Sequence, residues 1–225
     1  MHSHVNMPPP PPPQARVIIA VPHGQFLGRA YDWQSLHASH KLSSLLETMT
    51  HNIEVIVING DIHHEHCNLL HHGQCISSPS FRTQLRNLLS TTTTTTTTTT
   101  HTPGGLGGRV RPPSYVLDIQ SYPPTTTWGQ ASGDATRDAV IVYTSHDRQL
   151  AARRLAMAIR ERGAHALAVE NRFCSYSVTR ACRAHVPSAL LELSQTSILL
   201  DEVMQAIARH IVNVVKCERA RASIL

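Results

Sequence analysis

The amino-acid sequence predicts a single α/β domain with three layers, built on a mostly parallel mixed sheet. Short apolar runs rich in Val and Ile alternate along the chain with segments whose apolar residues recur at helical spacing. Such alternation of strands and helices is typical of a parallel sheet with helices on its faces. Hydrophobic residues make up 41% of the 225 residues and aromatic residues only 4%, so the core should be mainly aliphatic.

The predicted strands are short apolar runs, as expected for strands that are buried on both faces. They are residues 17–21, 54–58, 115–119, 139–143, 165–169 and 188–193. The first and second are rich in β-branched apolar residues, and the third and sixth are mainly apolar, which suits the interior of a sheet. We therefore expect these four strands to be central.

The predicted helices follow from apolar residues spaced three or four positions apart. One contains Leu42–Met49 and another covers residues 81–89. A third, over residues 147–162, should end at Gly163, because glycine readily adopts the left-handed conformation that closes a helix. The last helix contains a stripe of apolar residues that begins at Val203.

Two low-complexity segments are predicted to lie outside the folded core, one before the domain and one inserted within it. Residues 1–14 contain a run of prolines and are predicted to form a stiff, disordered tail. Residues 90–112 are rich in Thr and Gly and are predicted to be a disordered insertion, since they cannot bury enough apolar surface to fold. The domain is expected to span residues 15–217, followed by a C-terminal tail of residues 218–225.

Deleting residues 91–108 is expected to leave the melting temperature within a few degrees of that of the full chain. The segment should contribute conformational entropy but no packing, so its removal should cost little stability. Differential scanning calorimetry of the two proteins checks this prediction. A large fall in melting temperature would show that the insertion packs on the domain.

Charge and cysteine content limit the classes of partner and location. The net charge is +5, but the arginines of residues 148–162 have the spacing of a solvated helix face and no set of aromatic residues accompanies them, so a nucleic-acid partner is not favoured. No apolar run is long enough to span a bilayer, and the N-terminus lacks the apolar region of a signal peptide. The five cysteines form no CxxC pair, which suits a reducing compartment.

These features predict a soluble cytoplasmic protein with no membrane partner. The proline and threonine repeats also suit a viral protein, for which the virion is the alternative location.

Polar residues follow several of the predicted strands, where ligands bind in open α/β sheets. His23 follows the first strand, Gln120 the third, Asn171 and Arg172 the fifth, and Glu192 ends the sixth. Strand ends can be polar simply because they meet water. However, Glu192 stands between leucines, where a carboxylate is costly to bury unless it is paired or titrates. This placement favours a convergent site.

A histidine-rich segment, GDIHHEHCNLLHH, follows the second strand at residues 60–72. Imidazole is a common zinc ligand, so a metal site is one hypothesis. Because neighbouring residues of a strand point to opposite faces, His64 with His66, or His63 with a distant partner, could share an ion. Cysteine catalysis through Cys67 and a nearby histidine is another hypothesis.

The chain resembles a divergent member of the N-formylglutamate amidohydrolase-like proteins through segments that occur in the same order. They are VPHG (21–24), NGDIHHEHCNLLHH (59–72), FRTQLRNLL (81–89), VLDIQSYP (116–123), VENRFCSYSVTR (169–180) and VPSALLELS (186–194). The resemblance covers roughly residues 16–215 without the threonine insertion. It implies the α/β fold of the zinc carboxypeptidases and metal-dependent amide hydrolysis of a small-molecule or peptide-like substrate that bears a carboxylate.

The resemblance also implies site residues and zinc as the metal. Glu192 matches the general acid/base of the family and His23 a metal ligand, while Gln120 stands where the family has its second histidine. His64, from the histidine-rich segment, is a further candidate ligand. The implied substrate-binding residues are Asn68, Arg82, Asn171 and Arg172.

This sequence departs from the family pattern at several of these positions. A carboxamide such as Gln120 is a weaker zinc ligand than imidazole. Phe26 stands where a carboxypeptidase-type H-x-x-E motif would need an acid, and Asn68 replaces an expected aspartate. Two hypotheses follow. The protein is an active amidohydrolase in which the histidine-rich segment completes the metal coordination, or it is a catalytically degenerate member that acts as a binding or structural protein.

Overall fold

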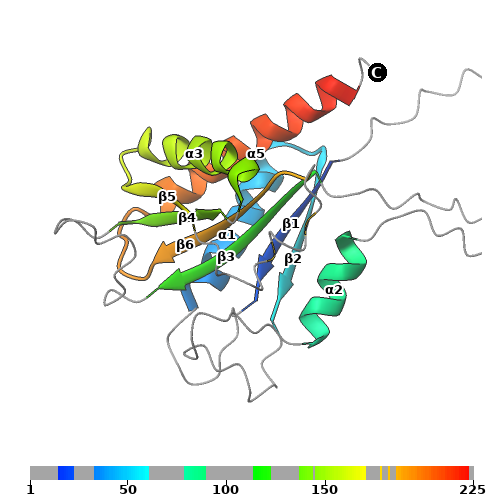
Figure 1. Ribbon diagram of the computed structural model, residues 1–225, viewed down its shortest axis with the longest axis horizontal. Coiled ribbons are helices and arrows are strands. Elements are labelled where there is room, and N and C mark those ends of the chain that lie inside the picture. The colour runs from blue at the N-terminus through cyan, green and yellow to red at the C-terminus, as the bar shows by residue number, and fades with distance from the viewer. Residues whose placement is uncertain are drawn as a thin grey trace, which may run out of the picture.

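The computed structural model describes residues 15–22, 33–60, 79–89, 114–122, 137–143, 145–170, 178, 182 and 186–222. Within these ranges the chain forms one six-stranded sheet with helices on both faces (Figure 1). The strand order is β2-β1-β3-β6-β4-β5. The predicted single α/β domain with a mostly parallel mixed sheet is therefore confirmed.

All six strands coincide with the apolar runs predicted from the sequence. They are β1 (Ala15–Val21), β2 (Ile53–Asn59), β3 (Tyr115–Tyr122), β4 (Ala139–Tyr143), β5 (Ala166–Glu170) and β6 (Ser188–Ser194). β1, β2, β3 and β6 run parallel to one another. β4 is antiparallel to β6 and parallel to β5. The sheet thus consists of four strands in one direction and two in the other.

The described helices also match the predicted ones. They are α1 (Trp33–Met49), α2 (Pro79–Leu89), α3 (His146–Arg160) and α5 (Leu200–Ala222). Gly163 adopts a φ of 83° just beyond α3, as expected of a glycine that closes a helix. α5 continues past residue 217 to Ala222. No described helix combines the length and the apolar character needed to cross a bilayer.

The prediction of which strands are central was wrong for one strand. β1, β3 and β6 are interior, but β2 lies at an edge of the described sheet, and β4 takes an interior place between β6 and β5. Every residue of β4 is buried, whereas β2 is partly exposed at most positions. An edge strand can still be strongly apolar when helices cover it, and both α1 and α2 contact β2.

The apolar core lies on both faces of the sheet. α1, α3 and α5 cover one face and α2 covers part of the other (Figure 1). Alternate residues along β1 therefore enter different clusters: Ile19 packs on the α1 side, whereas Ile18 packs with Phe81 and Leu85 of α2. The same alternation decides to which face each polar side chain of β3 and β6 points.

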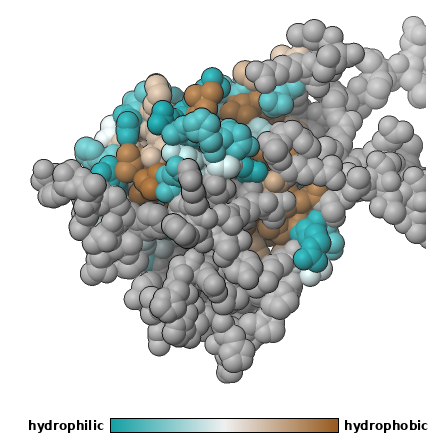
Figure 2. All heavy atoms as spheres, viewed as in Figure 1, coloured by the Kyte–Doolittle hydropathy of each residue, from teal (hydrophilic) through white to brown (hydrophobic). Residues whose placement is uncertain are grey.

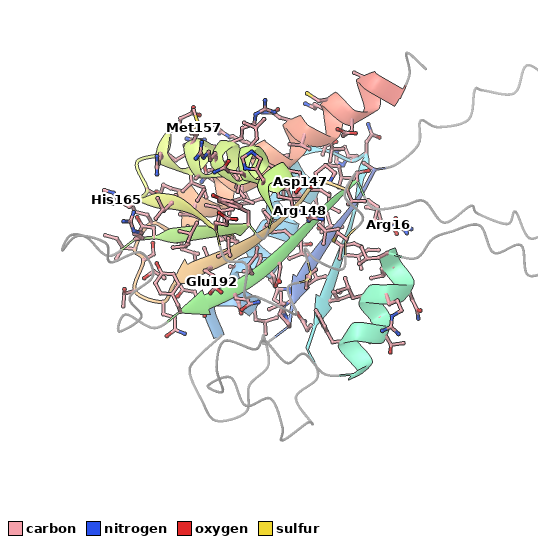
Figure 3. The ribbon with its side chains drawn as sticks, viewed as in Figure 1. Arg16, Asp147, Arg148, Met157, His165 and Glu192 are labelled. Carbon is pink, nitrogen blue, oxygen red and sulfur yellow. The ribbon has the colours of Figure 1, made fainter. Side chains whose placement is uncertain are left out.

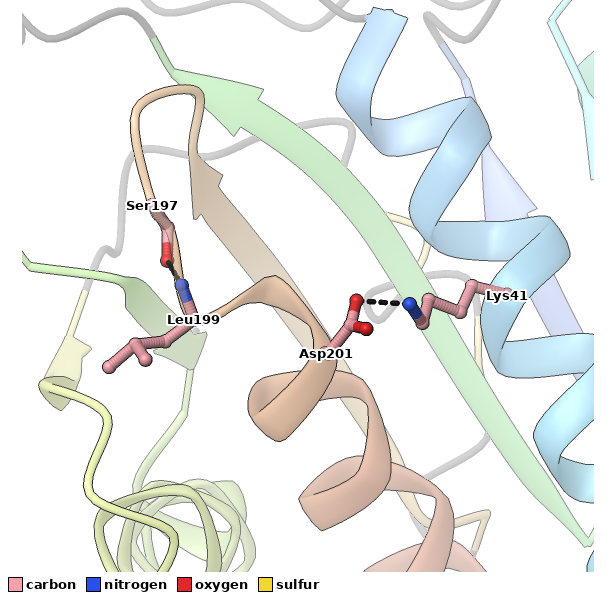
Figure 4. A network of polar contacts seen from close by, with 4 residues as sticks. All are labelled: Lys41, Ser197, Leu199 and Asp201. Atoms are coloured by element: carbon pink, nitrogen blue, oxygen red, sulfur yellow. Dashed lines mark hydrogen bonds and ion pairs between the residues drawn. The ribbon is translucent and has the colours of Figure 1, made fainter.

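Polar contacts hold the end of β6 and the start of α5 in place. The Ser197 hydroxyl donates to Asp138 Oδ1 at 2.6 Å and accepts a hydrogen bond from the Leu199 backbone nitrogen at 3.2 Å. In the first turn of α5, Asp201 forms an ion pair with Lys41 of α1 (Figure 4). These contacts link α5 to α1, and the turn before α5 to Asp138, the residue that precedes β4.

Candidate functional site

The directions of the strands decide which polar strand ends share an edge of the sheet. The carboxyl ends of β1, β2, β3 and β6 lie at one edge because these strands are parallel. β5 runs the opposite way, so its last residue, Glu170, lies at the other edge. The carboxyl ends of four of the six strands therefore share one edge of the sheet, and those of β4 and β5 lie at the other edge. Asn171 and Arg172, which follow β5, lie outside the described residues.

Gln120 and Glu192 are brought together by the pairing of β3 with β6. The two residues are direct partners in the parallel register. By strand alternation both side chains point to the face that α2 partly covers, and both are buried, with exposed fractions of 6% and 8%. Figure 3 shows Glu192 on β6, beside β3. Two of the predicted site residues are therefore neighbours near the carboxyl edge of the sheet.

Asp118 is a buried carboxylate that the sequence analysis did not single out. It lies two residues before Gln120 on the same face of β3 and is fully buried. Gln120 Nε2 donates to Asp118 Oδ1 at 3.4 Å, and the Val178 backbone nitrogen donates to Asp118 Oδ2 at 3.2 Å. These contacts turn the nitrogen of the Gln120 carboxamide toward Asp118. Asp118 also lies inside an apolar run, where a carboxylate is costly to bury unless it is paired. The reasoning that singled out Glu192 from the sequence would therefore have identified Asp118 as well.

Tyr122 stands next to the Gln120–Glu192 pair and remains protonated. Its hydroxyl donates to the Arg137 carbonyl oxygen at 2.5 Å. Burial is the main reason that the pKa of Tyr122 rises to about 12, and the negative charges of Glu192 and Asp138 add to the rise. The side-chain hydrogen bond with Ser194 acts in the opposite direction. Tyr122 is therefore a neutral hydrogen-bond donor at physiological pH.

Glu192 has a polar neighbour on one side and apolar neighbours on the other. Gln120 is its partner on β3, and Val140 is its partner on β4. Val140 belongs to a buried apolar cluster with Val142, Leu190 and the ring of Tyr122. The carboxylate of Glu192 thus lies at the boundary between this cluster and the polar residues of β3.

A close approach of two backbones joins the ends of β1 and β2 at the same edge. The Gly60 nitrogen donates to the Val21 carbonyl oxygen at 2.8 Å. A Cβ atom on Gly60 would lie 1.9 Å from the Pro22 carbonyl oxygen, so only glycine fits there. The side-chain oxygen of the neighbouring Asn59 is buried and has no hydrogen-bond partner among the described residues. These contacts fix the positions of the carboxyl ends of β1 and β2 relative to each other.

The remaining candidate residues are not covered by the described ranges. They are His23, His63, His64, His66, Cys67, Asn68, Asn171, Arg172 and the side chain of Arg82, whose backbone is part of α2. Within the part of the chain that the structure describes, no group of three or more His, Cys, Asp or Glu side chains is arranged to hold a metal ion. The metal-ligand and substrate-binding roles of these residues remain predictions.

No protein-family model matches the sequence, and no curated protein matches it. The fold, however, is similar to those of solved structures. One is the catalytic domain of CwlV, an N-acetylmuramoyl-L-alanine amidase from Bacillus (Paenibacillus) polymyxa var. colistinus, with a TM-score of 0.51 and 13% identity over 92% of this chain and 99% of that one. Another is the catalytic domain of the CD27L endolysin targeting Clostridia difficile, with a TM-score of 0.50 and 12% identity over 90% and 97%.

A third structure is an N-formylglutamate amidohydrolase from Ralstonia eutropha JMP134, with a TM-score of 0.46 and 9% identity over 94% of this chain and 96% of that one. At such low identities the similarity concerns the fold. The α/β fold seen here is thus shared with the catalytic domain of the amidase and with that of the endolysin.

Proposed function

We propose that this protein hydrolyses an amide bond in a small substrate that bears a carboxylate, with Glu192 carrying the proton. The observation that carries the proposal is the position of Glu192, a buried carboxylate paired with Gln120 near the carboxyl edge of the sheet. Ligands of open α/β sheets bind at that edge. The shared fold with an amidase supports the type of reaction.

Glu192 has the chemistry that amide hydrolysis requires of a protein side chain. A base must take a proton from the attacking water, and an acid must deliver one to the departing nitrogen. A single carboxylate can perform both steps in turn. Tyr122 lies close enough for the charge of Glu192 to raise its pKa. It donates its single hydroxyl proton to the Arg137 carbonyl oxygen, so it is a neutral, fixed neighbour of the carboxylate.

The proposal requires a metal site that includes Gln120. This residue would offer its carboxamide oxygen, next to Glu192 on the neighbouring strand, while Glu192 itself carries the proton. Zinc sites in enzymes usually combine carboxylate oxygens with imidazole nitrogens, so His23 and His64 are the residues proposed to complete this one. A bound zinc ion would polarise the amide carbonyl and lower the pKa of a bound water molecule.

A second candidate function is that of a binding protein that has lost turnover. It is favoured by Gln120, which stands where the resembled family has a histidine and whose nitrogen is held by Asp118. Only the weakly donating amide oxygen of this residue could reach a metal ion. In this case the protein keeps the fold and a pocket but has too few strong ligands for a catalytic metal.

Replacing Gln120 with His separates the two candidate functions. If the protein is degenerate, Gln120→His should raise zinc affinity by roughly tenfold or more, because imidazole is a stronger zinc donor than a carboxamide. Zinc content measured on protein purified without a histidine tag, together with titration calorimetry, gives the result. Gln84→His, on the exposed side of α2, is the matched control and should leave the affinity unchanged.

Near-stoichiometric zinc in the wild type with no gain in Gln120→His would contradict the degenerate hypothesis. It would instead assign the coordination to His23 and the histidine-rich segment. Release of amino acid from N-acylated amino acids, measured with added zinc, then tests turnover directly.

A further inference from the structure

α3 carries two large apolar side chains on its outer surface. Leu150 and Met157 are 58% and 57% exposed, although the opposite side of the same helix is buried against the sheet. Figure 3 shows Met157 directed away from the body of the protein. The two residues are seven positions apart, so they lie on one face of the helix about 10 Å from each other. Helices that pack along one another carry apolar residues that recur every seven positions, and Leu150 and Met157 have this spacing.

Two arginines lie between these apolar side chains on the same face. Arg153 and Arg154 are exposed, and neither forms a hydrogen bond or an ion pair with the described part of the chain. Figure 2 shows hydrophilic and hydrophobic side chains side by side over the region where α3 lies in Figure 1. We call Leu150, Arg153, Arg154 and Met157 the α3 face.

The other arginines of α3 have structural roles. Arg148 donates to the Ser188 hydroxyl and, at 3.1 Å, to the Cys182 carbonyl oxygen. Arg160 Nε donates to the Ala166 carbonyl oxygen at 2.7 Å. These contacts attach both ends of the helix to the sheet and its connections. The arginines in the middle make no comparable contact, so their guanidinium groups are available to a partner.

We propose that the α3 face binds an acidic amphipathic helix of a partner protein. The spacing of Leu150 and Met157 suits apolar side chains at heptad spacing on that helix. The planar guanidinium groups of Arg153 and Arg154 suit its carboxylates, which arginine can bind through two parallel hydrogen bonds. The surface belongs to a helix on the opposite side of the sheet from Glu192, so it is independent of the proposed hydrolysis.

Charge and size argue against two other occupants. A second copy packed through the same helix would place arginine against arginine, and like charges across an interface oppose binding. An anionic bilayer would meet the carboxylates of Asp147 and Glu161, which are exposed at the two ends of α3. Two half-exposed apolar side chains are also a small area for insertion into lipid.

The test uses a synthetic helical peptide with leucine at heptad positions a and d and glutamate at e and g. A second peptide carries lysine at e and g. Fluorescence anisotropy of labelled peptides is measured with the full-length protein at low and high salt. The glutamate peptide should bind, the lysine peptide should not, and the affinity should fall as salt screens the charges.

Charge reversal gives the sharper result. The double variant Arg153→Glu, Arg154→Glu should lose roughly tenfold or more of its affinity for the glutamate peptide and should now prefer the lysine peptide. The double variant Leu150→Ser, Met157→Ser should weaken binding of the glutamate peptide. Arg86→Glu on α2 changes an exposed arginine elsewhere and serves as the control.

Several results would overturn the proposal. They are absence of glutamate-peptide binding by the wild type, equal binding of both peptides, or an equal loss of affinity in Arg86→Glu. Binding of the wild type to phosphatidylserine-containing vesicles, with no binding to the glutamate peptide, would assign the face to lipid instead. Circular dichroism spectra that match the wild type establish that the variants are folded.

Discussion

Glu192→Gln is expected to lower the rate of amide hydrolysis roughly 10²- to 10⁴-fold, the usual contribution of a general acid/base. Glutamine has the size and shape of glutamate but cannot accept the proton from water. The fold should persist, because a neutral side chain at the boundary between Gln120 and Val140 costs less to bury than a carboxylate. The measurements are kcat/KM for an N-acylated amino acid and the thermal melting curve.

Glu170→Gln is the matched control for this substitution. Glu170 also ends a strand of the sheet, but it is exposed and lies at the opposite edge. Its replacement should leave kcat/KM unchanged. A Glu192→Gln variant that keeps wild-type activity would rule out Glu192 as the proton carrier. A wild type that shows no zinc-dependent hydrolysis would instead favour the second candidate, a binding protein.

Gly60→Ala is expected to lower the free energy of unfolding by about 3 kcal/mol, which is the upper range for overpacking a close contact. The added Cβ would lie 1.9 Å from the Pro22 carbonyl oxygen and 2.6 Å from the Pro22 carbonyl carbon. Both are backbone atoms, so no side-chain rotation can relieve the clash. The ends of β1 and β2 would have to separate, which weakens the hydrogen bond from Gly60 to Val21.

A loss of this size corresponds to a fall in melting temperature of roughly 6–12 °C for a domain of this length. Scanning calorimetry and urea unfolding give the two quantities. Gly163→Ala is the comparison, because nothing lies within 4 Å of its Cβ position and only its φ of 83° is unfavourable. That variant should lose about 1 kcal/mol. If Gly60→Ala costs no more than Gly163→Ala, the close approach of the two backbones is not a constraint on stability.

The sequence determined the strands and helices of this protein. A strand buried on both faces must be apolar along its length, and all six such runs became strands. A helix end that needs a left-handed residue favours glycine, and Gly163 has this role. These are local requirements of the backbone and of burial, so the local sequence is enough to predict them.

Strand order and direction were decided only by the tertiary structure. β2 and β4 have similar apolar sequences, yet one lies at an edge and the other in the interior of the described sheet. β5 runs against β1, which places Glu170 at the edge away from Glu192. An apolar run indicates that a strand is buried. It does not indicate which strand is its neighbour or in which direction the two run, because strand order and direction depend on the packing of the whole chain.

The candidate site shows the same division. Glu192 was found from the sequence because a carboxylate is unusual inside an apolar run, and Gln120 because it follows a predicted strand at a position where the resembled family has a histidine. Their direct pairing depends on the register between β3 and β6, and the hydrogen bond from Val178 to Asp118 joins residues 60 positions apart. Register and distant contacts arise from the packing of separate segments against one another. The sequence could therefore name two residues of the site, and the folded sheet determined which side chains they meet.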